Sequence, residues 1–120
     1  MTITFSQVQI GQLADQQFER RLVGVLAQSD PQATEAFATP DGMNELRQQC
    51  IKARTYGLES ELDIAKYVLS AWLLGQDFDV RFPAIQEFLR TDRLGPSQKA
   101  EAIERITLSI LAELNEGRAK

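Results

Sequence analysis

Two aspartates separated by one phenylalanine are the residues whose types and spacing point most directly to chemistry. Asp77 and Asp79 flank Phe78, and paired carboxylates can hold a divalent cation or act on a glycosidic bond. A calcium loop, however, needs further oxygen ligands and a distal glutamate, and these do not follow Asp79. The favoured interpretation is structural: Asp79 caps the following helix and Asp77 meets a nearby arginine. A small divalent-metal-dependent enzyme using both aspartates stays as an alternative.

The composition removes most other catalytic chemistry. The chain has 120 residues and no histidine, so it lacks the commonest general base and metal ligand. Cys50 is the only cysteine and is predicted to be a buried helix residue. No serine can be paired with a histidine, and no glycine-rich phosphate loop occurs. The sequence therefore predicts a protein that is not an enzyme and that uses neither cofactor nor metal.

The charge and hydropathy patterns argue against nucleic acid and membrane as partners. The net charge is −4, and the 13 basic residues are spread along the chain, whereas phosphate binding relies on clustered lysines and arginines. The most apolar stretch, residues 67–74, is far shorter than the roughly 20 residues of a membrane span. The first residues carry no signal-peptide pattern. We expect a cytoplasmic protein.

Apolar residues recur at helical spacing through nearly the whole chain. The pattern predicts an all-α fold, in which residues 1–120 form one domain, a single compact bundle of about five helices. Gly11 is expected to separate a short opening turn from the first long helix, and residues 115–120 are expected to fray. The expected helices are about 15–28, 39–56, 61–74, 82–90 and 96–114, and the loose stretch before residue 39 could hold one helical turn at residues 33–37.

The helix at 61–74 is predicted to be the centre of the fold. Its residues are apolar on almost every side, so neighbouring helices must cover it. Ser60 and Asp63 resemble a capping box at its start. Glu59, Glu61 and Asp63 put negative charge there, which either compensates the helix dipole on a solvated first turn, contacts a basic partner or forms a divalent-cation site.

Two segments are candidates for binding another protein. The turn from Gln76 to Pro83 places aromatic rings beside charges, as interface anchors do, although each ring could instead fill the core. The final helix carries an apolar seam that could pair with a second copy to form a homodimer or could face the core. The turn residues predicted to bind a partner are Asp77, Phe78, Asp79, Arg81 and Phe82, and the seam residues are Ile103, Ile106, Ile110 and Leu114.

A family resemblance covers about residues 46–89. The sequence Tyr56-Gly57-Leu58, a helix of aromatic and aliphatic residues, Gly75-Gln76-Asp77-Phe78-Asp79 and then Phe82-Pro83-Ala84-Ile85 follow one another. This pattern resembles small proteins encoded beside effector and spike genes in bacterial type VI secretion clusters. Leu73-Leu74 stands where that pattern has an aromatic residue.

The resemblance implies a cytoplasmic adaptor or co-chaperone that helps to load a toxic effector onto the secretion machinery, and it carries over no catalytic residue. The partner would be an effector or its chaperone. An immunity protein that covers the active site of a toxin is the main alternative, because an acidic chain suits a basic toxin.

Overall fold

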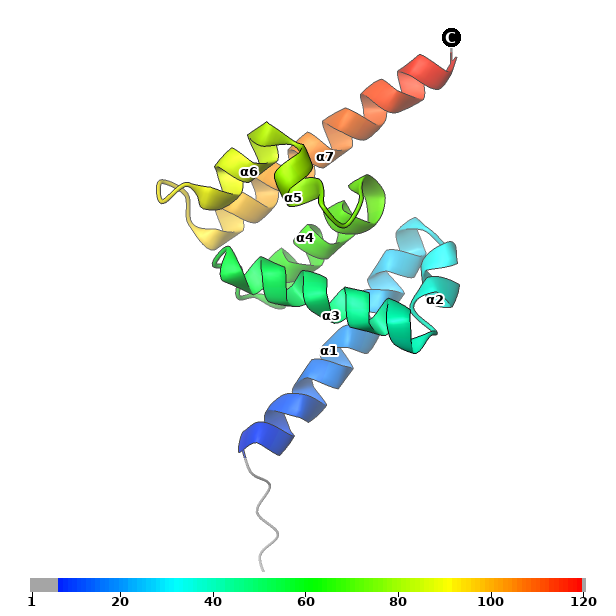
Figure 1. Ribbon diagram of the computed structural model, residues 1–120, viewed down its shortest axis with the longest axis vertical. Helices are drawn as coiled ribbons and strands as arrows, with labels where there is room; N and C mark the ends of the chain where they lie inside the picture. Colours follow the sequence, from blue (N-terminus) through cyan, green and yellow to red (C-terminus); the bar gives the residue numbers. More distant parts are fainter. Residues whose placement is uncertain (1–6, 120) are drawn as a thin grey trace, which may run out of the picture. The chain divides into compact units, whose positions relative to one another are not determined.

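The chain is all-α in the computed structural model, which describes the backbone of residues 7–119 and the side chains of residues 16–114. Seven helices and no strand occur within these residues (Figure 1). The helices are α1 (Gln7–Ser29), α2 (Gln32–Ala36), α3 (Pro40–Thr55), α4 (Glu61–Leu74), α5 (Phe78–Arg81), α6 (Pro83–Arg90) and α7 (Pro96–Ala119).

The five expected helices correspond to α1, α3, α4, α6 and α7, and the differences have simple causes. Helix α1 runs through Gly11 without a break, because one interior glycine costs only about 1 kcal/mol in a long helix. Phe5, expected in the opening turn, lies outside the described residues. Helix α7 continues to Ala119, past the point where fraying was expected. The short helix α2 lies where one helical turn was considered at residues 33–37, whereas α5 is additional and begins inside the segment expected to be a turn.

The chain divides into two compact units, residues 1–47 and 48–120, and helix α3 begins in the first and ends in the second. In the described part of the first unit, α1 packs on α2, and Arg47 Nε donates to Glu19 Oε1 at 3.0 Å. One domain spanning residues 1–120 stays a prediction. The buried apolar residues of the first unit are Phe18, Leu22, Leu26, Ala33, Phe37 and Leu46.

Helix α4 is the central element of the second unit, as its composition predicted. It packs along α7 and contacts α5, while α6 packs against α5 and α7. Cys50 is buried, as expected. None of the helices in the described residues is long and apolar enough to cross a membrane. Buried apolar residues of this unit include Leu58, Ile64, Tyr67, Val68, Phe78, Ile85, Leu89, Ala100 and Ile103.

Side chains at the helix ends tie these helices together. Ser60 Oγ accepts the backbone N–H of Asp63 at 3.1 Å, which confirms the predicted cap. The Asp63 carboxylate is not solvated as expected, because it is buried and accepts the Ser97 hydroxyl of α7 at 3.0 Å. Lys99 donates to the backbone oxygens of Tyr56 and Leu89, at 3.3 Å and 2.9 Å, and so joins the ends of α3 and α6 to α7.

Gly75 is the position at which a side chain should be least tolerated. Its φ of +114° is strained for any L residue, and an added Cβ would lie 3.4 Å from Asp77 Oδ1. We expect Gly75→Ala to lower the free energy of unfolding by about 1–2 kcal/mol in urea denaturation. The control is Gly24→Ala in α1, where a Cβ meets nothing within 4 Å and stability should rise by up to about 1 kcal/mol. Equal effects of the two substitutions would contradict the assignment of strain to Gly75.

Candidate partner-binding site

The five residues predicted to bind a partner divide between the inside and the outside of the second unit. Phe78 is fully buried and Asp79 is 3% exposed, whereas Asp77 and Arg81 are exposed and Phe82 is half-buried. Helix α5 is a single turn, so neighbouring positions point in different directions. For Phe78 the core interpretation is confirmed. Asp79 and Phe78 can therefore act on a partner only by supporting the surface above them.

Asp79 is held by the carboxyl-terminal half of α3. Its Oδ1 accepts from Lys52 Nζ at 2.7 Å, and its Oδ2 accepts from the Tyr56 hydroxyl at 2.7 Å. Lys52 Nζ also donates to the backbone oxygen of Gln76 at 3.0 Å, and Gln49 Nε2 donates to the same oxygen at 3.2 Å. The prediction that Asp79 caps a helix is therefore wrong, since it lies within the first turn of α5 and its carboxylate is directed to α3. We call these five residues the Asp79 network.

The spacing of three residues in the sequence is consistent with this network. Gln49, Lys52 and Tyr56 are spaced i, i+3 and i+7, which places them on one face of a helix. The sequence pattern predicts Tyr56 to be a helix-stop or core residue and Lys52 to be one of the scattered basic residues, and neither is predicted as a partner of Asp79. A buried aspartate needs a cation or several hydrogen-bond donors, so Asp79 and this face of α3 are natural partners once Asp79 is known to be buried.

The electrostatics of the network favour a charged Asp79 and neutral tyrosines. Burial raises the pKa of Asp79, but hydrogen bonds from Lys52 and Tyr56 outweigh it and hold the pKa below the ordinary value of 3.8. Burial, followed by the hydrogen bond to Asp79, raises the pKa of Tyr56 to about 12. Burial and the charge of Asp79 also raise the pKa of Tyr67.

Aromatic rings surround the network on the side of α4. The ring of Tyr67 lies 6.0 Å from that of Tyr56 and 4.8 Å from that of Phe78, the second pair meeting edge to face. Tyr67 is fully buried. This packing limits the access of water to the ion pair, and a charge pair with limited water interacts more strongly than one on the surface.

The outer side of α5 presents a small mixed surface, which we call the turn surface: Asp77, Val80, Arg81 and Phe82. Val80 is 55% exposed. The Arg81 guanidinium lies 5.6 Å from the centre of the Phe82 ring, a cation–π distance. Arg81 Nη1 is 4.0 Å from Asp77 Oδ1, and both side chains are well exposed. As expected, Asp77 meets a nearby arginine, but such a pair contributes little stability.

The two aspartates do not form a shared oxygen site. Asp77 faces solvent, while Asp79 already has Lys52 as its counter-ion. A divalent cation at Asp79 would have to displace the lysine amine. In the part of the chain with described side chains, no three acidic or cysteine residues lie close enough together to hold a metal ion.

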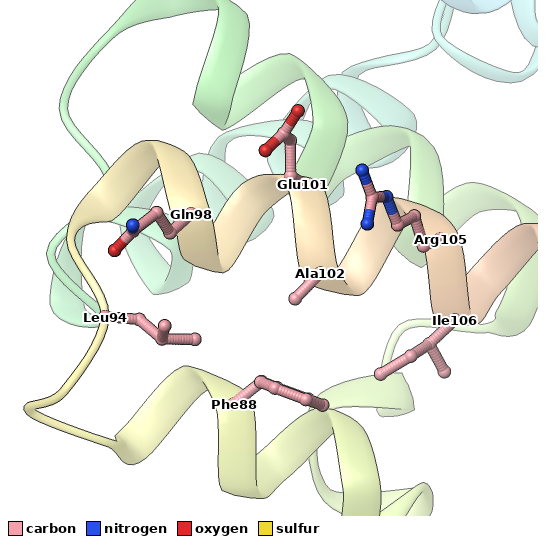
Figure 2. A pocket seen from close by; sticks show the side chains of 7 residues that line it. All are labelled: Phe88, Leu94, Gln98, Glu101, Ala102, Arg105 and Ile106. Carbon is pink, nitrogen blue, oxygen red and sulfur yellow. The ribbon is translucent and has the colours of Figure 1, made fainter.

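A second surface feature is a groove between α6 and α7 (Figure 2). Its volume is about 380 Å³. In the helical spacing of residues 82–90, Phe88 falls with the apolar Ile85 and Leu89, but its side chain is 38% exposed at the edge of the groove. The residues that line the groove are Phe88, Leu94, Gln98, Glu101, Ala102, Arg105 and Ile106.

Comparisons with known proteins do not assign the chain to a family. No protein-family model matches the sequence, and no curated protein or solved structure matches it either.

Removal of the Lys52 charge from the Asp79 network should lower the free energy of unfolding. We expect Lys52→Met to lower the free energy of unfolding by about 2–3 kcal/mol at neutral pH, since a buried carboxylate loses its counter-ion. Because Lys52 is 35% exposed, this loss is smaller than that for a fully buried ion pair. Asp79 has a lowered pKa, so its contribution is complete above its unfolded pKa and disappears as pH falls through the folded pKa. The difference between wild type and variant, measured by urea denaturation, should therefore shrink below about pH 4. A constant difference down to pH 2 would contradict the ion pair.

The two tyrosines of the chain should titrate abnormally. We expect tyrosinate absorbance of the folded protein to stay low at pH 10, where tyrosines of the urea-unfolded chain are half ionised, with Tyr56 titrating near 12. Because the pKa of Tyr56 is higher in the folded than in the unfolded state, its contribution to the free energy of unfolding is complete below the unfolded pKa. This contribution is lost as pH rises from 10 to 12. Tyr56→Phe should remove the earlier of the two steps. A normal titration of either tyrosine in the folded state would contradict its burial.

Proposed function

We propose that the chain is a non-catalytic protein-binding accessory factor, an adaptor or co-chaperone, that helps to load a type VI secretion effector and binds it through the turn surface. The observation that carries the proposal is the Asp79 network. An ion pair between the buried Asp79 and the partly exposed Lys52, together with two donors to one backbone oxygen, holds a helix of four residues, and the outer side of that helix is exposed.

An ion pair whose carboxylate is buried adds little net stability to a small unit. Desolvation of the two charges offsets much of their attraction, and well-packed apolar side chains are often at least as stabilising. The network fixes the position of α5 more than it adds to the free energy of unfolding. Lys52 Nζ donates both to the backbone oxygen of Gln76, before α5, and to Asp79, within it. A surface held in place in this manner loses little conformational freedom when a partner binds.

The composition of the turn surface suits protein recognition. Arginine and aromatic residues are enriched at interfaces, and here Arg81 is stacked on Phe82 beside the exposed Val80. No serine, cysteine or histidine accompanies them on α5. These features support a binding role for the surface.

The secretion context comes from the motif resemblance. The segments that carry it, Tyr56-Gly57-Leu58 and Gly75 to Asp79, include Tyr56, Gln76 and Asp79 of the network. The resemblance and the positioning of the turn therefore concern the same residues. An effector or its chaperone is the partner that this combination favours.

An immunity protein is the second candidate function, favoured by the net charge of −4, which would speed association with a basic toxin. The two functions predict different phenotypes when the gene is deleted. Loss of a loading factor should abolish delivery into competitors and leave the producer healthy, whereas loss of an immunity protein should poison the producer and its siblings.

The turn surface can be tested by capture of the neighbouring gene products. We expect the tagged chain to co-purify with an effector or effector chaperone encoded beside it, and Arg81→Glu and Val80→Asp each to reduce recovery at least about tenfold, since interface anchors contribute 2 kcal/mol or more. The matched control is Arg93→Glu, an exposed arginine outside the turn surface.

Unchanged thermal melting would show that the variants are folded. Full recovery with both turn variants would remove the turn surface from the proposal, and failure to recover any neighbouring effector or chaperone would remove the loading function itself.

A further inference from the structure

Tyr67 is a buried residue whose hydroxyl takes no part in the Asp79 network. Its side chain is fully buried in α4, and its hydroxyl has no hydrogen-bond partner among the residues whose side chains the structure describes. A buried hydroxyl without a partner lowers the stability of a folded protein, and a phenylalanine ring would fill the same space without that penalty. Packing therefore accounts for the ring of Tyr67 but leaves its hydroxyl without a role.

The ring that carries this hydroxyl lies beside both attachments of α5. Its centre is 4.8 Å from that of Phe78, the residue before Asp79, and 6.0 Å from that of Tyr56. The Tyr56 hydroxyl in turn donates to Asp79 Oδ2 at 2.7 Å. After burial, the negative charge of Asp79 is the next cause that raises the pKa of Tyr67. The Tyr67 hydroxyl is therefore close enough to the Asp79 carboxylate for the charge to act on it.

The Asp79 carboxylate can accept more hydrogen bonds than its side-chain donors supply. An ionised carboxylate has about four acceptor sites, whereas two side chains of the described residues, Lys52 and Tyr56, donate to it. Asp79 is 3% exposed, so bulk water offers little further help. The other buried atom without a partner, Gln49 Oε1, is an acceptor and cannot serve a carboxylate. Tyr67 is thus the residue with a spare donor beside Asp79.

Tyr56 is the tyrosine that can leave the carboxylate. It lies one position beyond Thr55, the last residue of α3, and is half-buried, whereas Tyr67 is fully buried in the middle of α4. Helix ends open locally more readily than packed helix interiors. Without Tyr56, Lys52 would be the remaining side-chain donor to a buried carboxylate, which a single partner satisfies poorly.

We propose that Tyr67 is a positioning residue for the turn surface: its hydroxyl donates to Asp79 whenever Tyr56 leaves the carboxylate, so that α5 keeps its position. The inference deepens the proposed function, because it rests on the binding role of the surface that α5 carries. Opening of the end of α3, or a partner that draws Tyr56 toward itself, then leaves Asp79 charged and hydrogen-bonded. Tyr67 acts through Asp79 and does not touch the partner.

A double-mutant cycle on the full chain separates this role from packing. Tyr67→Phe alone should leave the equilibrium constant of unfolding unchanged or lower it, because the hydroxyl has no partner while Tyr56 holds Asp79. In the Tyr56→Phe background the same substitution should raise that constant about tenfold, since a hydrogen bond to a charged group is then lost. Urea denaturation at neutral pH measures each protein of the cycle, and additive effects of the two substitutions would overturn the proposal.

The pKa of Asp79, followed by NMR of its side-chain carboxyl carbon, is a readout that ring packing alone would not move. In the wild type this pKa lies below the ordinary value of 3.8. Tyr56→Phe should keep it there, because Tyr67 replaces the lost donor, whereas Tyr56→Phe/Tyr67→Phe should raise it by about one unit. The matched control is Tyr56→Phe/Thr107→Val, which removes a buried hydroxyl bonded to Ser70 instead and should not raise it.

Two results would show that the Tyr67 hydroxyl does not serve Asp79. One is a pKa of Asp79 that rises as far in Tyr56→Phe as in Tyr56→Phe/Tyr67→Phe, and the other is a rise of the same size in the Thr107 control. Both measurements use the chain without a partner. They can therefore fail while an effector is still captured through the turn surface, and capture can fail while they succeed.

Discussion

A carboxylate that is charged yet almost inaccessible to solvent constrains the whole second unit. Asp79 keeps its charge only because Lys52 reaches it from α3 and Tyr56 reaches it from the position after the end of α3, so α3 must lie where its carboxyl-terminal half faces α5. Tyr67 and Phe78 then close the surroundings with packed rings. Burial of a charge without these partners would cost several kcal/mol, which makes the position of α3 beside α5 and α4 a requirement of the fold.

The network also explains how one short segment serves two purposes. Helix α5 has four residues, too few for a helix to be stable alone. Its buried positions, Phe78 and Asp79, attach it to the unit, while Val80 and Arg81 remain outside. The chemical pattern of an aspartate pair, which by itself suggests metal binding, is here divided between an anchoring residue and a surface residue.

The parts of the structure that depend on local periodicity could be predicted from the sequence. The bounds of α4 and the cap at Ser60 follow from neighbours in the chain. The pairing of Asp79 with Lys52 joins residues 27 positions apart, and such contacts leave no local trace, since a lysine on a helix face is usually solvated. The groove was missed for a related reason: its walls come from α6, α7 and the loop at Leu94, and their distance from one another depends on how the helices pack.

Helix α3 belongs to both compact units, and this has a consequence for the stability of the two parts. A helix forms cooperatively, because each residue added to an existing turn gains a hydrogen bond at small entropic cost. Melting of the first unit would leave the remainder of α3, from Gln48 to Thr55, as a segment of about two turns. Gln49 and Lys52, which hold Gln76 and Asp79, lie on this remaining segment. The stability of the first unit is therefore coupled, through the continuous backbone of α3, to the stability of the turn surface, about 30 residues further along the chain.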